Sequence, residues 1–230
     1  SWNMIKKIFV CIVAGVVSLQ AYGETDYTRY VNTLQGTDSD FGLSRGNTYP
    51  TAGMPFGVHC WSAQTGRNGD GFKYCYSADR IRGFAQAHQC SPWVNDYAVY
   101  SFMPVTGDLV VNEDLRATGF SHDNEIGMPH YYSVRLDNGI TAEMAPTERG
   151  VHMRFSYPAG KDAAWLVLDG YTEMSSIHID PERRTVSGWV NNQRFFNDSK
   201  SYRNYFVVQF DSQFEEWGMW ENVSDSIMPG

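Results

Sequence analysis

The second half of this chain alternates between apolar and polar side chains with a period of two. The pattern is present over residues 132–137, 140–144 and 151–157. In such a segment one row of side chains is buried and the other faces water, which is typical of antiparallel sheets. Asn138-Gly139 separates the first two runs and predicts a type I′ hairpin turn. These segments are therefore predicted to be paired antiparallel strands.

Further strands are predicted on both sides of this core pattern. Residues 164–168 form a continuous apolar run, which predicts a strand covered on both faces, and 185–190 and 205–210 add two more strands. The 21 Gly, 13 Phe, 14 Tyr and 7 Trp also favour sheets with many turns over a helical bundle. The sequence therefore predicts an all-β fold, a large antiparallel β-sandwich.

The region before the strands is different in character. Asp26 is placed to cap a short helix, and residues 36–71 are rich in loop signals. Long irregular stretches in a compact domain usually build a site. Asn68-Gly69-Asp70-Gly71 resembles the start of a calcium loop but lacks the later Glu, so an ordinary turn is predicted there.

The first residues have the features of an export signal. Lys6 and Lys7 precede an apolar run over 8–19, and Ala21 and Gly23 supply small residues before a cleavage point. The apolar run is too short for a stable membrane span. We therefore predict a signal peptide over residues 1–23, cleaved near Gly23, and a mature protein in the periplasm or outside the cell.

Charge and composition limit the classes of molecule that this protein is expected to bind. The net charge of −8 becomes −10 once Lys6 and Lys7 are removed, which argues against nucleic acid or an anionic membrane surface. Abundant Trp and Tyr, with flat apolar faces and polar edges, favour a neutral polar ligand such as a sugar. Cys60, Cys75 and Cys90 have no metal-ligand spacing, and buried thiols are expected rather than a disulfide framework.

No local catalytic signature accompanies these features. The chain contains no G-x-S-x-G, H-E-x-x-H, phosphate-binding loop or G-x-G-x-x-G. The residues alone therefore predict an exported β-sandwich that binds sugar.

Several blocks of the chain resemble, in the same order, motifs of glycoside hydrolase family 92. The blocks are Gly46-Asn47-Thr48-Tyr49-Pro50, Met54-Pro55-Phe56-Gly57, the stretch Ile81 to Trp93 with Asn95-Asp96-Tyr97, Phe102 to Gly107, and the hairpin segments from Phe120 to Tyr132 and from Thr141 to Gly150. The resemblance extends from about Tyr30 to Phe210. It identifies the chain as similar to a family of calcium-dependent, exo-acting α-mannosidases.

The resemblance implies two domains with different roles. Residues 24–230 would be the N-terminal β-sandwich, related to the galactose mutarotase supersandwich, and a larger (α/α)₆-barrel domain would follow. In the family the barrel supplies the general acid, the general base and most calcium ligands, so no catalytic and no metal residue is assigned here. The substrate class would be mannose-containing glycans, cleaved with inversion. The chain is expected to stop before the barrel and to be inactive alone.

Six residues are the candidates for binding the substrate: Gly46, Asn47, His88, Ser91, Trp93 and Asp96. Gly46 and Asn47 lie in a loop where glycine permits close approach of the backbone to a ligand, although a plain turn is the alternative. Trp93 is a candidate to stack on mannose, with a core Trp as the alternative. His88 and Asp96 are candidates to bind hydroxyls, or else a structural histidine and a turn cap.

Two further polar pairs, His122 with Glu125 and Glu143 with Arg149, are predicted to lie on sheet faces rather than to catalyse. Residues 89–93 depart from the Ser-Gly-rich stretch of many family members, which leaves the linkage preference open. Two other functions stay open: a free-standing carbohydrate-binding β-sandwich, and an interaction domain that binds no ligand.

Overall fold

The computed structural model describes residues 25–40, 42–57, 59–87, 99–160, 163–170, 175–191, 203–221 and 227–229. The chain separates into two units, residues 1–31 and 32–230. In the first, the 3-10 helix η1 (Thr28–Tyr30) follows Asp26, whose carboxylate accepts a 3.0 Å hydrogen bond from the Thr28 N–H. A helical turn is therefore found where one was predicted, but it is only three residues long and its N-cap residue is Tyr27, one residue after the predicted Asp26. The predicted signal peptide, 1–23, lies outside the described residues, among which no helix is long and apolar enough to cross a membrane.

The second unit is built from antiparallel strands, which confirms the all-β prediction. The strands are β1 (Cys60–Gln64), β2 (Arg80–Ile81), β3 (Gly83–Ala87), β4 (Ser101–Thr106), β5 (Thr118–Met128), β6 (Tyr131–Leu136), β7 (Thr141–Pro146), β8 (Val151–Ser156), β9 (Ala164–Asp169), β10 (Ser175–Asp180), β11 (Thr185–Val190), β12 (Asn204–Gln209), β13 (Gly218–Trp220) and β14 (Ile227–Pro229). They form sheets in the orders β2-β5-β6-β7-β8, β1-β3-β4-β9, β10-β11-β12 and β13-β14.

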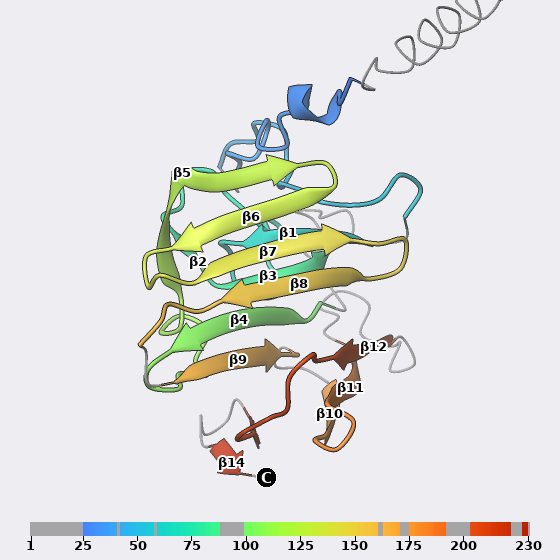
Figure 1. Ribbon diagram of the computed structural model, residues 1–230. Helices are drawn as coiled ribbons and strands as arrows, with labels where there is room; N and C mark the ends of the chain where they lie inside the picture. The colour runs from blue at the N-terminus through green and yellow to red at the C-terminus, as the bar shows by residue number, and fades with distance from the viewer. Residues whose placement is uncertain are drawn as a thin grey trace, which may run out of the picture. The chain divides into compact units, whose positions relative to one another are not determined.

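The two largest sheets form the sandwich. Figure 1 shows β5 to β8 as one layer in front of β1 and β3, while β4 and β9 continue the second sheet beyond β8. Phe84 of β3 lies between the layers, with its ring centroid 6.5 Å from Tyr132 of β6 and 6.0 Å from Phe155 of β8. Aromatic contacts of this kind join the sheets into one hydrophobic core.

The predicted alternation is confirmed where it was most regular. Tyr132, Val134, Ala142 and Met144 are each 0% exposed, and the residues between them on β6 and β7 are more accessible at most positions. Their apolar faces meet the second sheet, because a period of two keeps one row of side chains on one face. The alternation therefore determines which face of this sheet is buried.

The turn between β6 and β7 differs from the type I′ prediction. Gly139 has a φ of +89°, but Asn138 does not have a positive φ, and the Gly139 N–H donates to the Leu136 carbonyl at 2.9 Å. The Asn138 carboxamide oxygen instead accepts a 3.1 Å hydrogen bond from the Ile140 N–H. This is a three-residue loop with glycine in the left-handed position. The hairpin was predicted correctly and its turn type was wrong.

The prediction that residues 164–168 are covered on both faces is confirmed only in part, because Leu166 and Leu168 pack against the core while Ala164 is exposed. The run lies in β9, at the edge of the four-stranded sheet, where Val167 is 3% exposed. A continuous apolar run does not distinguish a central strand from an edge strand.

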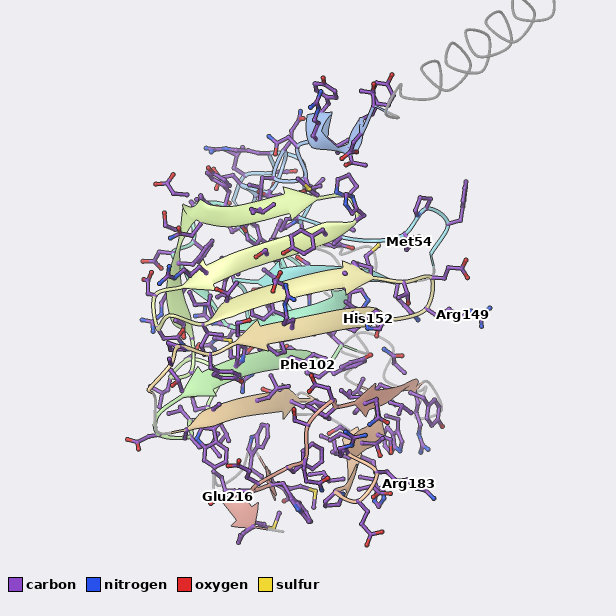
Figure 2. The ribbon with its side chains drawn as sticks, in the orientation of Figure 1. Met54, Phe102, Arg149, His152, Arg183 and Glu216 are labelled. Carbon is purple, nitrogen blue, oxygen red and sulfur yellow. The ribbon has the colours of Figure 1, made fainter. Side chains whose placement is uncertain are left out.

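The pair predicted for Glu143 also needs correction. Glu143 on β7 binds Arg154 on the neighbouring strand β8, with Nη2–Oε1 at 2.7 Å, because the strand register places the two residues opposite each other. Arg149 is exposed in the β7–β8 turn and extends away from the sheet in Figure 2. The Arg154 guanidinium lowers the pKa of Glu143 to about 2.

This ion pair predicts a pH-dependent stability difference. Because the folded pKa of Glu143 is depressed, its contribution is present above its usual pKa of 4.5 and is lost as the pH falls through about 2. Arg154 is 73% exposed, so we expect Glu143→Gln to lower the unfolding free energy by no more than about 1 kcal/mol at pH 7. Denaturation of wild type and variant at both pH values should show the difference vanishing towards pH 2. The exposed Glu148→Gln is the matched control and should show no such difference.

Candidate functional site

A hollow with a volume of about 370 Å³ lies in the loop-rich part of the chain that precedes β1. Its walls include Leu34, Gly36, Thr37, Asp38, Arg45 and Tyr76. Thr37 is 1% exposed and its hydroxyl donates to the Leu34 carbonyl at 2.7 Å, which fixes the loop on that side. A concave surface therefore lies within the stretch that was predicted to build a site.

Two glycines bring the ends of this loop together. Gly36 and Gly46 have φ values of +81° and +133°, a region open mainly to glycine. A Cβ atom on Gly46 would lie 2.6 Å from the Gly36 Cα atom. The two ends of the loop are also joined by a 3.2 Å hydrogen bond from the Thr48 N–H to the Gly36 carbonyl. The close backbone approach at the candidate Gly46 is therefore made to Gly36.

This contact makes Gly46→Ala a destabilising substitution. We expect it to lower the free energy of unfolding by about 1–3 kcal/mol, because strained backbone and a clash with backbone atoms combine. Gly107→Ala is the matched control, since Gly107 also has a positive φ of +81° but nothing lies within 4 Å of its added Cβ. Chemical denaturation should therefore show a larger loss for Gly46→Ala. Equal losses would mean that the contact with Gly36 contributes nothing.

The candidate Asn47 is held by hydrogen bonds within the loop. Its φ is +52°, a conformation that asparagine tolerates better than most residues. The buried Ser39 hydroxyl accepts from the N–H groups of Arg45 and Asn47 at 2.7 and 3.1 Å, and the Ser44 hydroxyl donates to Asn47 Oδ1 at 3.0 Å. These bonds set the shape of the loop around Arg45.

An ion pair forms part of the wall of the hollow. Arg45 Nη1 lies 2.8 Å from Asp38 Oδ2, and the two side chains are 59% and 34% exposed. Asp38 Oδ1 also accepts from the Ser77 N–H at 3.2 Å. Hydrogen bonding from the Ser77 side chain, more than any other contact, lowers the pKa of Asp38. The wall therefore presents an ionised carboxylate beside a guanidinium.

Tyr76 provides the aromatic side of the hollow. Its ring stacks on the His122 ring at a centroid distance of 3.9 Å and an interplanar angle of 1°. His122 Nε2 lies 2.7 Å from the Tyr76 carbonyl oxygen, and His122 Nδ1 lies 2.6 Å from Glu125 Oε2. Both ring nitrogens of His122 therefore lie within hydrogen-bond distance of an oxygen atom. This arrangement fixes the position of Tyr76.

Glu125 anchors this arrangement from inside the domain. Its side chain is 0% exposed and accepts hydrogen bonds from Tyr132 Oη at 2.5 Å and from Tyr74 Oη at 2.9 and 3.0 Å. Burial, followed by the charge of Glu125, raises the pKa of both phenols far above the usual value, so both stay protonated and donate. The predicted pair of His122 and Glu125 is confirmed, but Glu125 is in the core rather than on a wet sheet face.

A bulge in β5 explains that position. The pairing of β5 with β6 shifts between Phe120 and Glu125, which inserts extra residues into β5. Bulges redirect side chains, and this one is followed by Glu125 with its carboxylate in the core.

The candidates His88, Ser91, Trp93 and Asp96 all lie in the segment 88–98, which is outside the described residues. The structure gives only the two strands that this segment connects, β3 ending at Ala87 and β4 beginning at Ser101. Their binding roles stay predictions.

The sequence reasoning did not select Asp38, Arg45 or Tyr76. The only signal for the first two was their position in a loop-rich stretch, and Tyr76 had no signal of its own. Cys75, next to Tyr76, has a free thiol that points to Asp38 Oδ1 at 3.6 Å, and Cys60 is also a free thiol. Contacts between segments so far apart along the chain appear only after folding.

A second buried polar cluster lies where the loop between β4 and β5 meets β9. Arg116 Nη2 is 2.6 Å from Asp169 Oδ2, and the Arg116 side chain is 0% exposed. Glu113 Oε1 accepts from the Asn68 N–H at 2.6 Å, and burial raises the pKa of Glu113. These contacts tie the loop between β4 and β5 to β9 and to the 67–72 turn, so their role is structural.

The described residues do not fit a calcium site. No group of three or more His, Cys, Asp or Glu side chains among them is arranged to hold a metal ion. Asp70 in the Asn-Gly-Asp-Gly segment accepts from the Phe72 N–H at 3.1 Å and Gly69 has a φ of +78°, which confirms an ordinary turn.

Comparison with solved structures gives close similarity over most of the chain. An inverting family 92 mannosidase from Bacteroides thetaiotaomicron VPI-5482 is 38% identical with a TM-score of 0.84, covering 90% of this chain and 28% of that protein. A family 92 α-mannosidase from Bacteroides thetaiotaomicron is 26% identical with a TM-score of 0.68, covering 83% and 26%. This chain therefore spans about a quarter of the length of these enzymes.

Sequence comparison agrees with the structural likeness. An uncharacterised secreted glycosidase of Arthroderma benhamiae is 25% identical over 150 residues, which are 62% of this chain and 19% of that protein. The model of the glycosyl hydrolase family 92 N-terminal domain matches residues 30–227. The chain therefore belongs to the family of glycosyl hydrolase family 92 N-terminal domains.

Proposed function

We propose that this chain is the N-terminal domain of a secreted, exo-acting α-mannosidase that removes terminal α-mannosides from glycans. The observation that carries the proposal is the 38% identity and TM-score of 0.84 to an inverting mannosidase over 90% of the chain. The acidic composition, with a net charge of −8, favours a neutral glycan over an anionic partner. The relative from Arthroderma benhamiae, named a secreted glycosidase, supports export.

The catalytic steps would be shared between this chain and a second domain. In an inverting reaction one carboxylic acid protonates the leaving oxygen and a second carboxylate activates water on the opposite face of the sugar. Two of the buried carboxylates already have structural partners: Glu125 accepts from two tyrosine hydroxyls and Asp169 binds Arg116. We therefore assign both catalytic groups to a C-terminal (α/α)₆ barrel, and to this chain the binding and orientation of the glycan.

The calcium ligands would also be divided between this chain and the second domain. Because the described residues do not form a calcium site, we propose that the C-terminal domain supplies most of these ligands. Bound calcium would supply a hard cation that grips neighbouring sugar hydroxyls. This chain would line the remaining part of the glycan-binding site.

The proposal is tested with a panel of aryl glycosides and the full-length protein. We expect hydrolysis of the α-mannoside but not of the β-mannoside or α-glucoside, and loss of activity when calcium is chelated. The 230-residue chain alone should release no product. Hydrolysis by the chain alone at an enzyme-like rate would show that the catalytic groups have been assigned to the wrong domain.

A free-standing carbohydrate-binding module is the second candidate function. The hollow beside Tyr76 favours it, because an aromatic ring and polar side chains can bind a sugar without catalysis. If the full-length protein cleaves no glycoside but binds mannosides in calorimetry, this candidate replaces the first. An interaction domain would show neither property.

A further inference from the structure

We infer that the hollow formed by Asp38, Arg45 and Tyr76 is a binding site for one neutral pyranose ring of a glycan. This inference takes its ligand class from the proposed function and adds the residues and the geometry of recognition. None of the three residues was among the candidates drawn from the sequence. The hollow of about 370 Å³ falls in the size range of small-ligand sites.

Tyr76 supplies a fixed aromatic surface. One face of its ring is covered by His122 at 3.9 Å, so the 42% of Tyr76 that is exposed lies on the other face and the edge. Sugar rings have an apolar face of C–H groups that packs on such surfaces, and a ring that is already held loses little conformational entropy on binding. The buried Glu125 beneath His122 is what holds the platform in place.

Asp38 and Arg45 supply the polar contacts. A guanidinium offers five donors and an ionised carboxylate offers only acceptors, so the pair side by side can bind two neighbouring hydroxyl groups in opposite senses. Both side chains are accessible, at 34% and 59%. The Ser77 N–H holds the Asp38 carboxylate, and the Ser39 hydroxyl fixes the backbone at Arg45. A ligand with a full negative charge would meet Asp38, so the pair favours an uncharged polyol.

The test uses a sulfur-linked α-mannobiose, which resists hydrolysis, and isothermal titration calorimetry of the full-length protein. We expect Tyr76→Ala to weaken binding about tenfold and Tyr76→Phe to bind within about threefold of wild type, because the ring rather than the hydroxyl makes the contact. Arg45→Ala should weaken binding several-fold and leaves the Tyr76–His122 stack intact. Tyr205→Ala is the matched control, since Tyr205 is 69% exposed on β12 and should not affect binding.

The outcomes separate this inference from the proposed function. Unchanged affinity in both Tyr76→Ala and Arg45→Ala would overturn the inference, as would the absence of any binding to wild type. Hydrolysis of an aryl α-mannoside by the same preparations reports on the proposed function alone. If Tyr76→Ala weakens binding but the protein cleaves no mannoside, the inference is supported and the enzyme assignment is wrong. If the protein cleaves the mannoside but Tyr76→Ala and Arg45→Ala do not change binding, the enzyme assignment is supported and the inference is wrong.

Discussion

Arg116→Met is expected to lower the free energy of unfolding by about 3–5 kcal/mol. The Arg116 side chain is 0% exposed, and its guanidinium binds Asp169 Oδ2 at 2.6 Å and the Val111 carbonyl at 2.5 Å. Removing it leaves the Asp169 carboxylate, in a residue that is 8% exposed, without its buried cation. An uncompensated buried charge is among the largest single penalties in a folded protein. Urea denaturation of the purified variant measures the loss.

The exposed ion pair between Arg67 and Asp114 provides the control. Its shortest distance is also 2.6 Å, but the side chains are 69% and 46% exposed. Arg67→Met should therefore cost no more than about 1 kcal/mol. The double variant Arg116→Met with Asp169→Leu should recover part of the loss, because neither charge then remains buried. If Arg116→Met costs no more than Arg67→Met, the buried pair does not stabilise the domain as described.

Phe84→Ala is expected to cost about 3–5 kcal/mol, because it removes a large side chain from between the two sheets. Phe84 is 0% exposed and its ring packs against both Tyr132 and Phe155. The cavity would open where β3 meets β6 and β8, at the centre of the sandwich. Thermal and chemical denaturation of the variant measure the effect.

Phe56→Ala is the matched substitution at the surface. Phe56 is fully exposed and lies in a turn with a φ of +60°, so its ring gives up no buried contact on removal. We expect a change within about 0.5 kcal/mol. Similar losses for both phenylalanines would mean that the two sheets do not share the core described here.

Most of the sandwich could be predicted because its main sheet faces the core on one side. Val134 and Met144 are buried at alternate positions of β6 and β7. This one-sided burial is visible in the sequence as an apolar–polar alternation with a period of two. The edge position of β9 could not be predicted, since a run such as Ala164 to Leu168 does not specify its neighbours. The type of turn at Asn138 depended on where the strand pairing ended.

The candidate site was predicted only in part. Gly46 was selected as a position of close backbone approach to a ligand, but the structure shows that approach being made to Gly36, ten residues earlier. The substrate-binding roles of Gly46 and Asn47 stay predictions. The stack of Tyr76 on His122 joins segments 46 residues apart and depends on a bulge in β5, and no periodicity encodes a bulge. Burial of Glu125 follows from the same bulge. The roles of the residues in 88–98 stay predictions.

The most direct test of the proposed mannosidase is the stereochemistry of the first product. Full-length protein is mixed with an aryl α-mannoside, and proton NMR follows the anomeric signal of the released sugar before mutarotation mixes the anomers. An inverting α-mannosidase must release β-mannose first. Release of α-mannose first, or no release of mannose at all, would contradict the assignment of this chain to an inverting α-mannosidase.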